Sequence, residues 1–248
     1  MRGFSPRRKT RSDCPPRKPG CSKLWRRNGG SELHLLLASG NEHKRLEFSR
    51  FFASLEHGGS AAVRLLSPCD FKGVPDAEET GSSYEENALL KARAWARRTG
   101  IPSIADDSGL EVRALGWRPG IYSARAGEND SDRINWLLGE LSGRDDRRAR
   151  FVACLVIAFP FERSVRRDYF ASSGVCWGNI SSPRGKSGFG YDPIFVPDGY
   201  GATFAELGPS VKSEISHRAS AMRGVAQIIN SVVKYDAVYR GTLRESSD

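Results

Sequence analysis

Residues 33–38 form an apolar run that stops at Ser39-Gly40-Asn41, and a helical pattern of apolar residues follows from Glu42. A buried strand that breaks at glycine and enters a helix predicts an α/β fold. The first backbone N–H groups of a helix lack internal partners and carry the positive end of its dipole, so this turn can bind phosphate. Lys44 would add a cation one turn in. Because any α/β protein has such turns, the pattern is also expected without a ligand.

The length of 248 residues permits one large domain or a two-lobed unit with a substantial core. Apolar residues make up 39% of the chain and charged residues 27%, which is typical of a soluble globular protein. No apolar run approaches the roughly 18 residues that a membrane helix requires. We therefore expect neither a membrane protein nor a membrane partner.

The net charge of +9 is confined to the first thirty residues. Ten of the 38 basic residues and one of the 29 acidic residues lie in residues 1–30, so the remaining chain is neutral. A nucleic-acid surface needs an excess of positive charge, so no nucleic-acid partner is expected for the folded part. Residues 1–30 fit a disordered tail, an organellar targeting peptide or sequence upstream of the true start. We favour a dispensable tail, a folded domain over 31–240 and a frayed C-terminus over 241–248.

The five cysteines are odd in number and contain no C-x-x-C pair. Cys154 lies in a strongly apolar run and is predicted to be a buried thiol. This usage predicts a reducing compartment, which we take to be the cytoplasm, without a disulfide frame or structural zinc.

Two adjacent carboxylates, Asp106 and Asp107, follow an apolar approach and precede Ser108 and Gly109. We expect the chain to turn here. Neighbouring side chains of a strand point to opposite faces, so one acid would face a cleft while the other braces the turn. An Asx-turn with a helper serine explains the same residues without any function.

Upstream of this pair, acidic residues gather before a predicted helix. Ser83-Tyr84-Glu85-Glu86 has the spacing of a capping box, and residues 87–98 are rich in strong helix formers. Glu85 and Glu86 suit the positive end of the helix, so capping accounts for them. Glu79 lies outside this pattern and is freer to contact a ligand.

The second half of the chain predicts a helix over 130–141 and two antiparallel strands over 151–159 and 169–177. A Gly-rich segment follows, with Phe189, Gly190, Tyr191 and Asp192 near its end. A ligand could approach its backbone closely and stack on an aromatic ring, although a Gly-rich hairpin explains it equally.

Three cations, Lys212, His217 and Arg218, are predicted near the start of a last helix that ends at about Val233. Basic residues at a helix N-terminus oppose its dipole, so a balancing anion is expected there.

Taken together, these motifs resemble those of the Ham1/RdgB family of inosine and xanthosine triphosphate pyrophosphatases over roughly residues 33–235. The six motifs that carry the resemblance are 37–44, 79–81 with 86–88, 105–110, 119–125, 188–193 and 215–219. Serine replaces the usual threonine at position 39, and Gly116-Trp117-Arg118 replaces a Gly-Gly pair, so the rim of the pocket differs more than its chemistry.

The resemblance implies Mg²⁺-dependent hydrolysis of dITP, ITP and XTP to the monophosphate and pyrophosphate, which clears these nucleotides from the pool. It also implies a homodimer and a two-lobed α/β fold, with a long mixed sheet flanked by helices and an active-site cleft between the lobes. Asp107 would be the proton acceptor and a metal ligand, with Glu79 a second ligand. The implied substrate contacts are Ser39, Gly40, Asn41, Glu42, His43, Lys44, Ser108, Phe189, Gly190, Tyr191, Asp192, Lys212, His217 and Arg218.

Chemistry agrees with this assignment, because a triphosphate needs cations on its phosphates and a carboxylate to hold a metal and orient water. A related nucleotide pyrophosphatase of the Maf type is one alternative, disfavoured by the segments 188–192 and 216–219. A nucleic-acid-binding protein driven by its basic tail is another, disfavoured by the neutral folded part.

Overall fold

The computed structural model describes residues 33–56, 62–71, 77–160 and 168–245, with side chains of the last helix described to residue 231. The predicted tail, residues 1–30, lies outside the described residues. One mixed sheet has the strand order β2-β1-β3-β4-β5-β6. Its strands are β1 (Leu33–Leu37), β2 (Val63–Leu66), β3 (Ser103–Val112), β4 (Arg148–Ala158), β5 (Tyr169–Ile180) and β6 (Phe195–Pro197).

Five α-helices accompany the sheet in the described part of the chain. They are α1 (Glu42–Glu56), α2 (Tyr84–Thr99), α3 (Asp130–Glu140), α4 (Phe204–Ile215) and α5 (His217–Glu245). Among these helices, none is both long and apolar enough to cross a membrane.

The sheet changes character at β3. Parallel pairing joins β1 to β2 and to the first two residues of β3, where Leu36 lies opposite Ser103 and Leu37 opposite Ile104. Along its length β3 pairs with β4, and β4 with β5, in long antiparallel ladders. The predicted α/β fold with a long mixed sheet is therefore confirmed, as is the antiparallel pairing of the two long strands.

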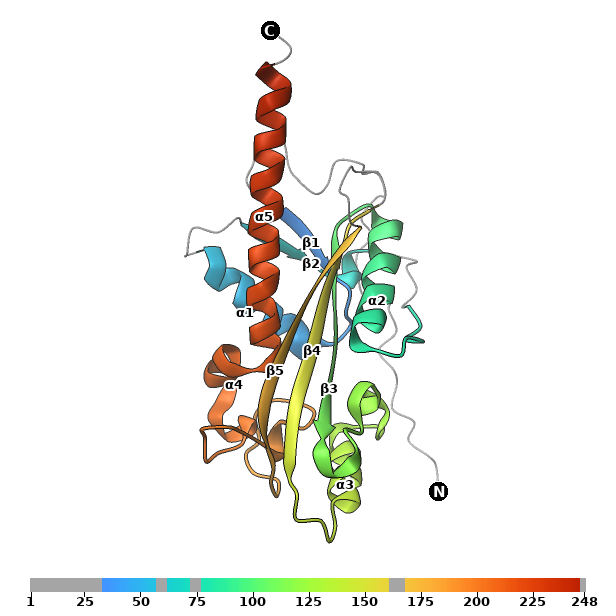
Figure 1. Ribbon diagram of the computed structural model, residues 1–248, viewed down its shortest axis with the longest axis vertical. Coiled ribbons are helices and arrows are strands. Elements are labelled where there is room, and N and C mark those ends of the chain that lie inside the picture. The colour runs from blue at the N-terminus through green and yellow to red at the C-terminus, as the bar shows by residue number, and fades with distance from the viewer. Residues whose placement is uncertain (1–32, 57–61, 72–76, 161–167, 246–248) are drawn as a thin grey trace, which may run out of the picture.

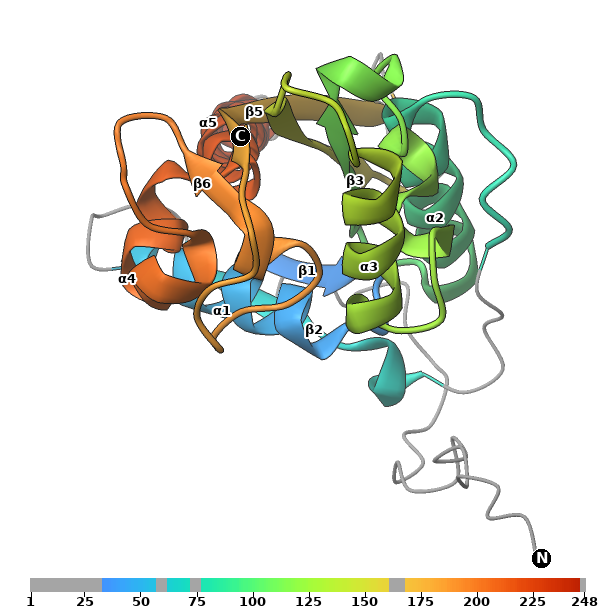
Figure 2. The ribbon, with the colours of Figure 1, turned by 90° about the horizontal axis from the view of Figure 1, so that it is seen from below.

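Three apolar cores divide the molecule. At the β1 end, α1 and α5 cover one face of the sheet and α2 covers the other. At the opposite end a third core packs α3 and α4 against β3, β4 and β6. Seen from below, α2 and α3 lie on one side of the molecule and α1 and α4 on the other, as Figure 2 shows, while Figure 1 shows the long strands joining the two ends.

The start of α2 carries half of the predicted capping box. Ser83 Oγ accepts a hydrogen bond from the Glu86 amide at 3.2 Å, as an N-cap does. The Glu86 carboxylate accepts instead from the Ser82 amide at 2.7 Å, one residue before the cap. The helix ends at Gly100, whose φ of 69° is the left-handed conformation that glycine adopts without strain.

The predicted turn at Asp106–Gly109 is wrong, because β3 runs unbroken from Ser103 to Val112. Glycine is needed at position 109 for close packing rather than for turning. A Cβ there would lie 2.2 Å from the Gly120 carbonyl oxygen and 2.9 Å from the Tyr84 hydroxyl. The strand therefore passes directly beneath the 3₁₀ helix η4 (Gly120–Arg125).

The cation-bearing segment also differs from expectation. Lys212 lies in the last turn of α4, while His217 and Arg218 begin α5, so the three cations come from two helix ends rather than one helix start. The last helix extends to Glu245, past its predicted end near Val233.

Candidate active site

The turn between β1 and α1 is open at its glycine and capped by its own side chains. Ser39 Oγ accepts a hydrogen bond from the Asn41 amide at 3.2 Å, and Asn41 Oδ1 accepts one from the Lys44 amide at 3.1 Å. A Cβ on Gly40 would meet no atom within 4 Å. The turn can therefore receive an anionic group against the start of α1.

Asp106 is a buried anchor for two cations. Its Oδ2 lies 2.7 Å from Lys44 Nζ and 3.0 Å from Arg218 Nη2, and it accepts a hydrogen bond from Ser108 Oγ at 3.2 Å. Burial would raise the pKa of Asp106, but the charges of Arg218 and Lys44 outweigh burial and hold that pKa well below its usual range. The carboxyl is thus a permanent anion that orients two cations.

Asp107 points to the opposite face of β3, toward α2. Its Oδ2 accepts from Asn87 Nδ2 at 3.3 Å and its Oδ1 lies 3.4 Å from Lys91 Nζ. Lys91 Nζ also contacts Glu79 Oε1 and the Asp106 carbonyl oxygen, each at 2.9 Å. The two acids therefore converge on one ammonium group.

The electrostatic setting of Asp107 differs from that of its neighbour. Burial raises the pKa of Asp107 and the Glu79 charge adds to this, while Lys91 opposes it without cancelling it. Burial would raise the pKa of Glu79, but the hydrogen bond and charge of Lys91 together with the charges of Arg125 and Lys44 outweigh burial and lower that pKa. A carboxylate with a raised pKa is the better proton acceptor of the two.

A second cluster of buried charges lies beneath the Gly-rich segment. Lys212 Nζ lies 2.6 Å from Asp192 Oδ2 and 3.0 Å from Glu47 Oε1, and Arg218 Nη1 lies 2.5 Å from Glu47 Oε2. Asp192 Oδ2 also accepts a hydrogen bond from the Phe189 amide at 2.9 Å. These contacts fix the backbone of Phe189 above Lys212.

His217 is a buried, neutral side chain at the start of α5. It is 4% exposed and stacks on Phe151 with ring centroids 4.7 Å apart. Its Nδ1 has no hydrogen-bond partner within the described residues. Burial and the neighbouring Arg218 charge lower its pKa well below the usual value, so the imidazole is uncharged at neutral pH.

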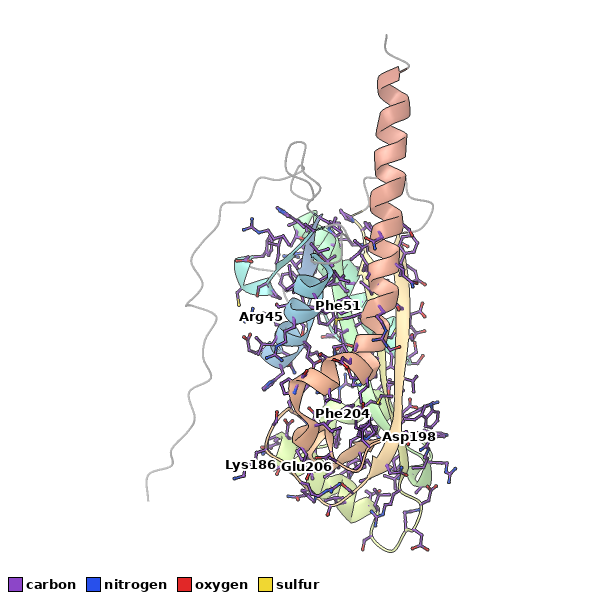
Figure 3. The ribbon with its side chains drawn as sticks, turned by 90° about the vertical axis from the view of Figure 1, so that its left-hand side faces the viewer. Arg45, Phe51, Lys186, Asp198, Phe204 and Glu206 are labelled. Carbon is purple, nitrogen blue, oxygen red and sulfur yellow. The ribbon has the colours of Figure 1, made fainter. Side chains whose placement is uncertain are left out.

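These groups line one cavity of about 550 Å³. Of the predicted site residues, it is lined by Ser39, Gly40, Asn41, His43, Lys44, Glu79, Ser108, Phe189, Gly190, Tyr191, Asp192, Lys212, His217 and Arg218. Asp106 also lines it, whereas Asp107 stands behind Lys91. Glu42 does not line the cavity and instead pairs with Arg45, which is on the outer side of α1 in Figure 3.

Comparison with known proteins adds a decisive match, because residues 35–228 fit the Ham1 family. The chain belongs to the Ham1 family. A Ham1 relative in Geobacillus kaustophilus, named dITP/XTP pyrophosphatase, is 46% identical over 194 residues, covering 76% of this chain and 90% of the relative. A relative of the same name in Oceanobacillus iheyensis is 42% identical over 205 residues, covering 80% of this chain and 98% of the relative.

Solved Ham1 structures share the fold. The HAM1 protein from Coxiella burnetii matches with a TM-score of 0.70 and 38% identity over 80% of this chain and 99% of that one. The Staphylococcus aureus Ham1 protein matches with a TM-score of 0.68 and 36% identity over 80% of this chain and 98% of that one.

Sequence reasoning missed several groups that complete the site in this Ham1 chain. Asn87, Lys91 and Trp95 recur every four residues along α2, so they share one helix face, and this spacing was an available signal. Glu47, one turn after Lys44, was similarly readable. Asp130, which accepts a hydrogen bond from the Gly190 amide at 2.6 Å, left no local signal, whereas Arg125, which contacts Glu79, ends the motif 119–125 but was given no role.

Proposed function

We propose that this chain hydrolyses non-canonical purine nucleoside triphosphates, namely dITP, ITP and XTP, to the monophosphate and pyrophosphate. The observation that carries the proposal is a cavity with buried cations on one face of β3 and a converging carboxylate pair on the other, in a Ham1 chain. Relatives that align over most of their length are named dITP/XTP pyrophosphatases. Such hydrolysis removes these nucleotides before they enter DNA or RNA.

The reaction divides between the two faces of β3. The triphosphate lies against the open turn at Gly40, where the start of α1 and Lys44 offset its charge. Asp107 accepts a proton from the water that attacks the α-phosphorus, which its raised pKa favours. The leaving pyrophosphate gains negative charge, which the Lys44 cation stabilises.

Asp107 and Glu79 also fit a magnesium ion. Both carboxylates already converge on the Lys91 ammonium, so this position attracts positive charge. No group of three or more potential ligands from His, Cys, Asp and Glu converges among the described residues. Mg²⁺ commonly uses one or two carboxylates, with water and substrate phosphates completing its shell, so two suffice. When bound, the ion would lower the negative charge of the phosphates and the pKa of a water ligand.

Base selection rests on donors near His217 and Arg218. Hypoxanthine and xanthine present an oxygen acceptor at position 6, where adenine presents an amino donor. The uncharged His217 imidazole carries one N–H donor, and its Nδ1 is free of protein partners among the described residues. Adenine would leave buried donors unpaired, which is costly.

The decisive experiment is a substrate panel with pyrophosphate release as the readout, with Mg²⁺ present. We expect dITP and XTP to be hydrolysed at least about 100-fold faster than dATP, as a site that hydrogen-bonds its base can achieve, with dGTP included in the panel because it shares the oxygen at position 6. Omitting the metal should abolish turnover. Similar rates on all four nucleotides would contradict the selectivity, and no pyrophosphate from any of them would contradict the reaction.

A homodimer is the second part of the proposal. The outer face of β4 and β5 carries Trp177, which is 38% exposed and meets Trp117 edge-to-face with ring centroids 6.0 Å apart. The Arg150 guanidinium lies 4.6 Å from the Trp117 ring and 5.1 Å from the Trp177 ring. Trp117 has a φ of 68°, a left-handed conformation that bulky residues rarely adopt. Exposed aromatic residues around an arginine support a protein interface.

Light scattering of the purified chain tests the dimer. The wild type should have twice the chain mass, and Trp177→Ser should shift it toward the monomer. Ser173→Ala, on the same exposed side of β5, is the matched control. A monomeric wild type would remove this part of the proposal without affecting the reaction.

A further inference from the structure

The imidazole of His43 lies face to face with the phenyl ring of Phe189. Their centroids are 4.9 Å apart and their planes differ by 12°. His43 is exposed in the first turn of α1, directly before Lys44, whereas Phe189 belongs to the Gly-rich segment far along the chain. This stack is therefore a tertiary contact between the two segments that line the active-site cavity.

A second cavity of about 570 Å³ lies beyond this stack. Its walls come from α1, α4 and α5 and include Phe51, Phe204 and Met222; Figure 3 shows Phe51 on α1 and Phe204 at the start of α4. Among the residues that the structure describes, only His43, Phe189 and Lys212 line both cavities. These three side chains thus form the partition between them.

Of the three residues in the partition, Lys212 and Phe189 are held in place by buried contacts, whereas His43 is exposed. Lys212 is 6% exposed and ion-paired to Asp192 and Glu47, with its Nζ 4.2 Å from the centre of the Phe189 ring. The backbone amide of Phe189 donates to the same Asp192. His43, in contrast, stands on an exposed helix turn, where a rotamer change takes picoseconds to nanoseconds.

Planar rings stack at about 3.5 Å, so a base inserted between two rings needs them roughly 7 Å apart. A separation of 4.9 Å is direct contact, and a modest swing of the His43 side chain would open the required gap. Lys44, the next residue, points to Asp106 on the phosphate side of the cavity. The first turn of α1 can therefore contact both the base and the phosphates of one nucleotide.

We propose that His43 is the movable half of a base sandwich, and that the purine of the substrate inserts between His43 and Phe189. This inference rests on the proposed function and deepens it, because it gives His43 a role at the base rather than at the phosphates. A planar base is the chemical class that fits, since stacking on two rings favours any flat heterocycle over a bare phosphate chain.

The test compares a ligand with a base to a ligand without one. Binding of inosine monophosphate and of inorganic tripolyphosphate is measured by calorimetry, with Mg²⁺, for the wild type, His43→Ala and His43→Phe. Arg50→Ala is the control, because Arg50 is exposed on the same helix and lines only the second cavity. Thermal unfolding confirms that each variant is folded, as expected for an exposed position.

His43→Ala should weaken inosine monophosphate binding roughly 10-fold, the range for loss of one stacking partner, and leave tripolyphosphate binding within twofold of wild type. His43→Phe should restore the nucleotide affinity. An equal loss for both ligands would overturn the proposal in favour of a phosphate contact. Unchanged nucleotide binding in His43→Ala would overturn it in favour of stacking on Phe189 alone.

The failure of the proposed function looks different. A wild type that neither releases pyrophosphate from dITP nor binds inosine monophosphate would overturn both proposals together. A wild type that does both, with His43→Ala unaffected, overturns the sandwich alone.

Discussion

At the scale of single residues, Asp106 and Asp107 are neighbours with opposite surroundings. Asp106 lies among Lys44 and Arg218, which lower its pKa, while Asp107 lies beside Glu79 in a position that raises its pKa. The alternation of a strand is sufficient to produce this difference, because it turns the two carboxyls to opposite faces.

Replacing Asp107 with asparagine should lower kcat at least about 100-fold, since a general base contributes 10² to 10⁴ in rate. The fold should persist, because Lys91 keeps its ion pair with Glu79 and the amide oxygen of the asparagine can still accept one of the two hydrogen bonds. Pyrophosphate release and thermal unfolding measure the two effects, with the exposed Asp145→Asn as control. Full activity in Asp107→Asn would remove this residue from its proposed role.

In the metal-free protein, an NMR titration should give Asp107 a pKa higher than the usual 3.8, because burial and the Glu79 charge disfavour its ionised form more than Lys91 favours it. Glu79→Gln removes a like charge and should lower the pKa of Asp107 in the same metal-free titration. An Asp107 pKa that is unchanged in Glu79→Gln would contradict this assignment.

Replacing Asp106 with asparagine should mainly affect stability. It leaves Lys44 and Arg218 buried with one anion fewer, which costs about 3 kcal/mol in the free energy of unfolding at pH 7. Because the folded-state pKa is lowered, this stabilisation is present above the usual pKa and is lost as pH falls toward the folded value. Urea unfolding measures the difference, and a loss below 0.5 kcal/mol, about that of a surface substitution, would contradict it.

At the scale of elements, replacing two different glycines with alanine is expected to change the stability of the fold in opposite directions. A Cβ on Gly174 in β5 would lie 2.1 Å from the His217 carbonyl oxygen, so Gly174→Ala should force β5 and α5 apart and destabilise the fold by about 1–3 kcal/mol. A Cβ on Gly139 in α3 would meet nothing within 4 Å. Gly139→Ala should therefore stabilise the protein by about 0.5–1 kcal/mol. Denaturant unfolding of both variants checks the pair, and equal effects would contradict the packing argument.

The elements themselves were largely readable from the sequence. Apolar runs placed β1 and β4, alternation placed β5, and the cap at Ser83 placed the start of α2. The turn predicted at Gly109 failed because close approach to η4 and turning both demand glycine, and sequence alone does not separate these causes.

The sequence predicted most of the residues of the site but not the contacts between them. Motifs supplied most of the residues that line the cavity, but not their pairing. Contacts such as Lys91 with Glu79 and Asp107, or Arg218 with Glu47, depend on where three elements meet in space. No local pattern in the sequence encodes those distances.

At the scale of the whole molecule, charge is distributed unevenly, with the nine net positive charges in residues 1–30 and a neutral remainder. Removing residues 1–30 should leave pyrophosphate release from dITP within about twofold of the full chain, because no described active-site group comes from that segment. A salt-sensitive affinity for nucleic acid, if measured, should disappear with the same deletion. Loss of turnover on deletion would contradict this expectation.

The unbroken run of β3 bears on which changes of length the gene can tolerate. Ten consecutive residues of β3 pair one to one with residues of β4, so a residue cannot be added or removed without shifting this pairing. Deleting or inserting a single residue of β3 before Asp106 would exchange the faces of the two acids while leaving the rest of the sequence unchanged. Such a protein would keep nearly all of its composition, yet carry its proton acceptor among the phosphate cations and turn the core side chains of the shifted strand to the opposite face. We therefore expect natural variation in this strand to occur by substitution and almost never by a change of length.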